Sequence, residues 1–221
     1  MSKLFFVFPF FLLASCTLGG PISYDKTPQS QTIQQDTFVA SPTTASGGKL
    51  EFSQTGNVNL SKVFTENFHY LDSEKKSFAS GSLSELLKWY SGAVVYFYPK
   101  DGTPNCTIQA LDFSLMLADF RAKGYEVIGV SKDNMDAHKS FADRNELKIK
   151  LLEDGSGELL RAFGSEWPLQ TYGNGDALSD IIRSTYVIDA SGNPMYAFRD
   201  VTAKGHARRI YELVTGESYT K

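Results

Sequence analysis

Cys106 is the side chain of this sequence best suited to nucleophilic chemistry. It lies in YPKDGTPNCTIQALDF (residues 98–113), between a loop rich in Pro, Asp and Gly and a pattern typical of a helix. A cysteine in the first turn of a helix faces unpaired backbone N–H groups and the positive end of the helix dipole, and both favour the reactive thiolate. Free cysteine is also a common small hydrophobic residue of protein cores, so position alone leaves a structural role equally open.

The elements around Cys106 predict an α/β domain. The apolar run at residues 93–98 is typical of a strand buried on both faces, and the loop after it leaves the carboxyl end of that strand, where α/β sheets usually place their sites. Because strands and helices then alternate, we expect a mixed central sheet flanked by helices. Further strands are expected at residues 49–54, 67–72, 125–131 and 148–152, a hairpin at 184–198, and helices at 81–90, 107–122, 134–145, 157–164 and 206–216.

Composition excludes several classes of function. The 221 residues carry a net charge of −3 with a pI near 5.7, which offers no basic face for nucleic acid. Two cysteines, Cys16 and Cys106, cannot build a framework of several disulfides. The histidines His69, His138 and His206 show no ligand spacing, so the sequence predicts surface or ordinary structural roles for them and no metal site. It predicts no cofactor either.

Residues 1–15 have the pattern of a bacterial lipoprotein signal. An apolar run from Leu4 to Ala14 is shorter than the about 20 apolar residues that a membrane span needs. The run ends in Leu13-Ala14-Ser15-Cys16, which resembles the lipobox, whose cysteine sulfur receives a diacylglycerol. The sequence therefore predicts an exported protein, lipid-anchored through Cys16 to a bacterial membrane and facing the periplasm or the cell exterior. A plain signal peptide, with Cys16 removed or unused, is the alternative.

Residues 16–48 are predicted to be a flexible linker attached to that lipid. The stretch is rich in Ser, Thr, Gln, Pro and Gly, has few apolar residues and shows no periodicity. The pattern changes from about Lys49, so residues 49–221 are predicted to form the folded domain.

The spacing of Pro99, Thr103 and Cys106 (P-x-x-x-T-x-x-C) resembles that of the peroxiredoxins. The most similar branch is the Q type, also called bacterioferritin comigratory protein, and the likeness extends from about Phe68 to Leu213. It includes the blocks VVYFYPKDGTPNCTIQALDF, YEVIGVSKDNMDAHKSFADR, LLEDGSGELLRAFG and RSTYVIDASGNP, in the same order as in the family. The resemblance implies a thioredoxin-like fold and an enzyme that reduces peroxides.

The resemblance also implies a role for each matching residue. The Cys106 thiolate would attack one peroxide oxygen and become a sulfenic acid. The Thr103 hydroxyl would hold the peroxide, and Pro99 would shield the pocket and fix the loop. Arg183, which matches the family's arginine, would stabilise the thiolate and the charge that develops on the leaving oxygen. Gln109 would orient that arginine.

One departure from the family concerns the second cysteine. Many Q-type members carry a resolving cysteine five residues after the first, where this chain has Leu111. The resemblance therefore implies a one-cysteine peroxiredoxin whose sulfenic acid is reduced by an external thiol, either a small molecule or a thioredoxin-like protein. A peroxide-sensing or binding protein with little turnover is the alternative, and the missing cysteine is the feature that favours it.

Overall fold

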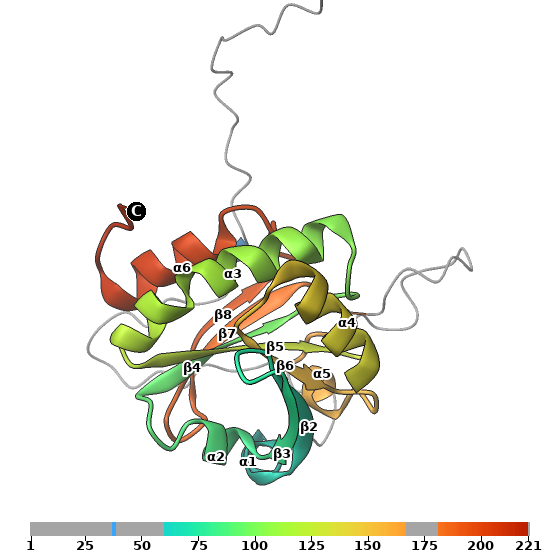
Figure 1. The fold of residues 1–221 in the computed structure, drawn as a ribbon. Coiled ribbons are helices and arrows are strands. Elements are labelled where there is room, and N and C mark those ends of the chain that lie inside the picture. The colour runs from blue at the N-terminus through green and yellow to red at the C-terminus, as the bar shows by residue number, and fades with distance from the viewer. Residues whose placement is uncertain (1–36, 39–59, 167–180, 221) are drawn as a thin grey trace, which may run out of the picture. The chain divides into compact units, whose positions relative to one another are not determined.

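The computed structural model describes residues 37–38, 60–166 and 181–220 of the chain (Figure 1). The chain divides into two units, Met1–Gln34 and Gln35–Lys221. The first unit lies outside the described residues, and the second contains the sheet and all of the described helices. None of those helices is long and apolar enough to cross a membrane.

One mixed sheet forms the centre of the second unit. Its eight described strands lie in the order β1-β8-β7-β4-β5-β6-β2-β3. The pairs β4–β5 and β5–β6 are parallel, and the other neighbouring pairs are antiparallel. The strands are β1 (Thr37–Phe38), β2 (Phe68–Asp72), β3 (Ser77–Gly81), β4 (Gly92–Phe97), β5 (Tyr125–Ser131), β6 (Lys150–Glu153), β7 (Ser184–Asp189) and β8 (Pro194–Arg199). The predicted α/β class with a mixed central sheet is confirmed.

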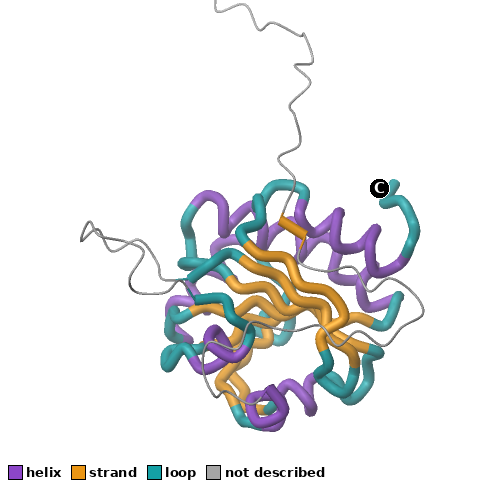
Figure 2. Tube along the Cα trace, turned by 180° about the vertical axis from the view of Figure 1, so that it is seen from behind, coloured by secondary structure: helices purple, strands orange, loops and turns teal. Residues whose placement is uncertain are grey.

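Helices cover both faces of this sheet. On one face α3 and α6 lie side by side with α4 beyond them, and α1, α2 and α5 lie on the other, as Figure 1 and the reverse view in Figure 2 show. The described helices are α1 (Leu60–Thr65), α2 (Leu83–Leu86), α3 (Pro104–Ala122), α4 (Met135–Asn145), α5 (Glu158–Ala162) and α6 (His206–Thr215).

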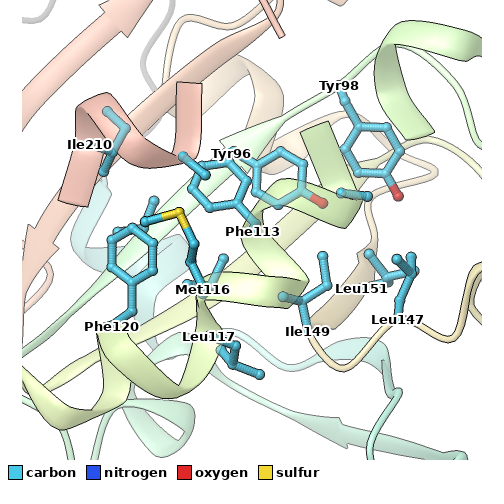
Figure 3. Packing of buried hydrophobic residues seen from close by; sticks show 14 of the residues in the cluster. Tyr96, Tyr98, Phe113, Met116, Leu117, Phe120, Leu147, Ile149, Leu151 and Ile210 are labelled. Atoms are coloured by element: carbon cyan, nitrogen blue, oxygen red, sulfur yellow. The ribbon is translucent and has the colours of Figure 1, made fainter. Parts of the chain in front are cut away.

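β4 is buried along its whole length because its side chains pack into two hydrophobic clusters, one on each face of the sheet. Successive side chains of a strand point to opposite faces of the sheet. Val94 and Tyr96 therefore join the cluster under α3, α4 and α6, whereas Val95 and Phe97 join the cluster under α1, α2 and α5. Figure 3 shows the first cluster, in which the ring of Tyr96 meets that of Phe113 from α3. The continuous apolar pattern predicted this two-sided burial correctly.

The helix that carries Cys106 begins earlier than predicted. The sequence indicated residues 107–122, but α3 starts at Pro104 and ends at Ala122. Proline is favoured at the first helical position, because its fixed φ suits the helix and its missing N–H would have no helical partner there. Cys106 is therefore the third residue of α3, inside the first turn.

Several short elements differ from the prediction or were not predicted. The sequence pattern predicted neither α1 nor the edge strand β3. The expected strand at residues 49–54 lies outside the described residues. Thr37 and Phe38, within the predicted linker, pair with Phe198 and Arg199 of β8. An edge strand offers unpaired backbone groups, which two residues of strand-forming type can satisfy. Residues 37 and 38 of the predicted linker therefore form a strand. That the rest of residues 16–48 is a flexible linker stays a prediction.

A buried carboxylate ties the start of β5 to two neighbouring elements. Glu126 is fully buried, and its two oxygens accept hydrogen bonds from Arg121 Nε (3.2 Å) and Nη2 (3.1 Å) and from Lys150 Nζ (2.8 Å). Burial opposes ionisation of this group, but Lys150 and Arg121 outweigh it and lower the pKa of the Glu126 carboxyl below its ordinary value of 4.5. The ionised form is therefore part of the native fold.

Replacing Glu126 with Gln should lower the free energy of unfolding at pH 7 by roughly 3 kcal/mol, because it leaves two cations near a buried neutral group. A carboxyl whose pKa is lower in the folded state stabilises the fold above its unfolded pKa, and this contribution disappears as the pH falls through the folded value. The difference between wild type and E126Q in urea unfolding should therefore shrink steadily below pH 4.5.

The matched control is Asp143→Asn, which breaks an exposed pair between Lys139 and Asp143. Exposed pairs contribute little to stability, so D143N should unfold like wild type. Equal effects of the two substitutions would contradict the structural role given to Glu126.

Candidate active site

Strand register brings the Cys106 loop and Arg183 together. β4 and β7 are antiparallel, and Phe97 at the end of β4 pairs with Ser184 at the start of β7. The residue before β7 therefore lies beside the loop after β4. The backbone carbonyl of Arg183 accepts a hydrogen bond from the N–H of Val201 (3.0 Å), which fixes the residue on its other side.

The Cys106 sulfur lies at the centre of a small polar cluster. The residue is only 1% exposed, and Arg183 Nη2 donates to its Sγ at 3.3 Å. Arg183 Nη1 donates to Oε1 of Gln109 at 2.6 Å, so the contact between Gln109 and the arginine that the family resemblance implied is present. A guanidinium held at two nitrogens is a permanent, oriented cation beside the sulfur. This arrangement stabilises negative charge on Sγ.

Thr103 lies at the N-cap position of α3, but its hydroxyl does not cap the helix. Its Oγ1 donates to the carbonyl of Lys100 at 3.1 Å instead. Because that hydrogen is used, the hydroxyl presents acceptor lone pairs to any ligand near Cys106. Pro99, half-buried, begins the same loop one residue after Tyr98. The catalytic roles of Thr103 and Pro99 stay predictions.

Aromatic rings form an apolar floor beneath the cysteine. Tyr96 stacks on Phe113 with ring centroids 4.7 Å apart and on Tyr98 at 5.4 Å. Burial raises the pKa of Tyr96 well above its ordinary value, and electrostatic interactions with the nearby Asp101 and Cys106 side chains add to the shift. The phenol therefore stays neutral, and little water reaches this side of the sulfur.

The loop before Cys106 is also held by residues that the sequence pattern does not place at the site. Asp101 accepts a hydrogen bond from the hydroxyl of Tyr98 (2.8 Å) and lies 2.8 Å from Nδ1 of His138 in α4. The structural role predicted for His138 agrees with this burial. The sequence did contain a signal for the first contact, because Tyr98 and Asp101 lie three residues apart just after a buried strand. No local pattern identifies His138 as the partner of Asp101.

The described part of the chain offers one thiol to this site. Cys106 is a free cysteine, and residue 111, where the family resemblance would place a resolving cysteine, is a half-buried leucine packed against the core. Within the same residues no group of three or more His, Cys, Asp or Glu side chains is placed to hold a metal ion. The chemistry that this arrangement supports is attack by a single sulfur on an electrophile small enough to reach a nearly buried residue.

Several known proteins are similar to this chain in sequence. A model of the AhpC/TSA family matches residues 65–196, more than half of the chain. A putative peroxiredoxin bcp of Helicobacter pylori (strain J99) is 38% identical over 131 residues, which are 59% of this chain and 84% of the relative. The peroxiredoxin Bcp of Xanthomonas campestris pv. campestris is 36% identical over 133 residues, which are 59% of this chain and 82% of the relative.

Solved structures show the same fold. A cysteine mutant of Xanthomonas campestris peroxiredoxin Q superposes with a TM-score of 0.61 at 28% identity, over 70% of this chain and 92% of that one. A mutant of Xylella fastidiosa PrxQ gives a TM-score of 0.60 at 26% identity, over 70% and 91% of the two chains. The predicted thioredoxin-like architecture is thereby confirmed. The chain belongs to the AhpC/TSA family and is a peroxiredoxin of the Bcp (peroxiredoxin Q) branch.

Proposed function

We propose that this chain is a lipid-anchored, one-cysteine thiol peroxidase that reduces hydrogen peroxide and organic hydroperoxides. The activity class, a thiol-dependent peroxidase, follows from its membership of the peroxiredoxins. The contact between Arg183 Nη2 and Cys106 Sγ is the observation that carries the proposal, because it joins a nucleophile to a fixed cation. The similar bacterioferritin comigratory protein of Xanthomonas campestris has alkyl peroxide reduction activity, which supports organic hydroperoxides as substrates here.

The oxidative step transfers one oxygen to sulfur. The Cys106 thiolate attacks the terminal oxygen of ROOH, the S–O bond forms as the O–O bond breaks, and the RO⁻ that leaves takes a proton to become ROH. The Thr103 hydroxyl accepts the hydrogen bond of the incoming peroxide. The Arg183 guanidinium faces the oxygen on which negative charge develops. The product is Cys106 sulfenic acid.

The reductive steps need thiols from outside the chain. A first thiol attacks the sulfenic sulfur, giving a mixed disulfide and releasing water. A second thiol then attacks the mixed disulfide, which regenerates the Cys106 thiol and releases an oxidised disulfide. An external reductant is required because the folded domain contains no second cysteine.

The alternative function, a peroxide sensor with little turnover, receives less support. The curated relatives are named as peroxiredoxins, which favours an enzyme that turns over. Steady-state peroxide consumption with a supplied thiol separates the two functions. A sensor would stop after one equivalent of peroxide.

Cys106→Ser should abolish peroxide consumption and leave the fold intact, because serine is close to cysteine in size and the change removes only the nucleophile. The assay follows hydrogen peroxide loss with dithiothreitol as reductant, and circular dichroism checks the fold. Activity that survives in C106S would show that another group reacts with peroxide.

Arg183→Ala should slow the oxidative step by two to three powers of ten, because removing one preorganised donor from a developing charge costs about 2.7–4 kcal/mol. Gln109→Leu should slow it less, since it leaves the guanidinium in place without its second anchor. The measurement is the second-order rate constant for peroxide under single-turnover conditions. Arg208→Ala, which breaks an exposed pair with Glu212 in α6, is the matched control and should react like wild type. A wild-type rate in R183A would exclude Arg183 from the reaction.

Lipid attachment at Cys16 is supported by the sequence Leu13-Ala14-Ser15-Cys16 behind an apolar run, in residues outside those that the structure describes. We expect the Cys16→Ala precursor to remain unprocessed or to leave the membrane fraction when it is produced in bacteria, whereas Thr17→Ala should behave like wild type. Mass spectrometry of the mature amino terminus makes the decisive comparison. A wild-type terminus without lipid would rule out the anchor.

A further inference from the structure

A buried aspartate and histidine join the Cys106 loop to helix α4. The His138 side chain is fully buried and that of Asp101 is 6% exposed, with 2.8 Å between His138 Nδ1 and Asp101 Oδ2. The other carboxylate oxygen, Oδ1, accepts from the Tyr98 hydroxyl at 2.8 Å. Both oxygens of Asp101 are therefore satisfied by buried donors. His138 Nε2 is buried without a hydrogen-bond partner among the described residues, so Asp101 provides the side-chain contact that holds the ring.

The main chain of the same loop is held at the same point. The N–H of Asp101 donates to Asp133 Oδ2 at 2.8 Å, and the hydroxyl of Ser131 donates to that oxygen at 2.8 Å. Ser131 ends β5, which lies parallel to β4, so the loops after both strands emerge at one edge of the sheet. Asp101 thus fastens the loop of β4 to the loop and helix that follow β5.

The first turn of α3 depends on this loop. No side chain caps the helix, and the Thr103 hydroxyl is bonded backwards to the carbonyl of Lys100. The helix is linked forward through Thr103, whose carbonyl accepts from both the N–H and the hydroxyl of Thr107 at 2.9 Å. Release of Asp101 would therefore loosen the segment that starts the helix, and Cys106 lies within that turn.

The nearly closed site is better suited to oxidation of Cys106 by peroxide than to reduction of its sulfenic acid by a thiol. A peroxide is small, but the thiol of a protein must bring its own sulfur into line with the S–O bond of a sulfenic acid that is almost fully enclosed. The sulfur of a residue that is only 1% exposed does not offer that approach. The reductive half-reaction therefore requires the loop and the first turn of α3 to move.

We propose that the Tyr98–Asp101–His138 contacts form a latch that holds the Cys106 turn closed for oxidation and sets how often it opens to an external thiol. The proposal rests on the peroxidase function above and adds positioning residues to it. Without His138, the buried Asp101 carboxylate loses a donor and is better solvated outside, and its movement to solvent carries the loop with it. Loosening the latch thus slows oxidation and speeds reduction.

The test uses the full-length chain and four substitutions. His138→Leu removes the donor to Asp101, while His138→Asn keeps an amide N–H near the position of Nδ1. Tyr98→Phe removes only the donor to Oδ1. His69→Leu is the matched control, because this exposed histidine of β2 contacts Ser80 on the far edge of the sheet.

Hydrogen exchange followed by mass spectrometry reports the opening without any need for activity. In H138L the amides of residues 107–110 should exchange about tenfold faster, or more, while those of α6 stay unchanged. Tyr98→Phe should give a smaller increase in the same segment, and H138N should return it toward wild type. Unchanged exchange in H138L, or an equal increase throughout the chain, would overturn the latch.

Stopped-flow kinetics then separate the two half-reactions. For H138L we expect slower oxidation by hydrogen peroxide and about tenfold faster reduction of the sulfenic acid by reduced thioredoxin, with a smaller gain for 2-mercaptoethanol. A histidine that only supports the fold would slow both steps, and that result would refute the proposal. If wild type does not consume peroxide, the proposed function fails, whereas the exchange result still decides whether the latch exists.

Discussion

The contact between Arg183 and Cys106 is the interaction on which the rest of this site depends. It spans 3.3 Å between residues 77 positions apart in the chain, and the antiparallel register of β4 and β7 makes it possible. Gln109 holds the other guanidinium nitrogen, and the first turn of α3 holds the sulfur. The two-sided core around β4 fixes both ends of this geometry. Stability of the sheet and reactivity of the thiol are therefore linked through the same strand.

Local sequence patterns predicted most of the elements, because burial and periodicity are local properties. The fully apolar strand β4 and the helix α6 are examples, and the site at the end of β4 followed from the fold class. The contact between Arg183 and the sulfur was accessible only through family resemblance, since no local signal reports strand register. The pairing of Asp101 with His138, 37 positions apart, was missed for the same reason. The strand β3 is not predictable locally, because Ser77–Gly81 is short and, apart from Phe78, consists of small residues without strand preference. The start of α3 differs from the prediction because proline is common both in loops and at the first position of a helix.

Because the domain has no second cysteine, the enclosure of Cys106 affects every catalytic cycle. In a domain with one thiol, every turnover needs a partner sulfur to reach a nearly enclosed site. The same enclosure keeps bulk water away from Cys106, and the stacked rings of Tyr96, Tyr98 and Phe113 maintain it. Protection of the sulfur and access to it are therefore competing demands. The fold balances these demands where the loop after β4 enters α3. Arg183 holds Cys106 and Gln109 of α3, and His138 of α4 holds Asp101 of the preceding loop.

The most direct test of the central claim follows the fate of the Cys106 sulfur in the wild-type protein. The protein is treated with one equivalent of hydrogen peroxide in the absence of thiol, trapped with dimedone, digested without reduction and analysed by mass spectrometry. A site with one thiol and a fixed arginine predicts a dimedone adduct on the peptide that contains Cys106 and no intramolecular disulfide. Unmodified Cys106 after the peroxide has been consumed, or an internal disulfide at that residue, would contradict the account.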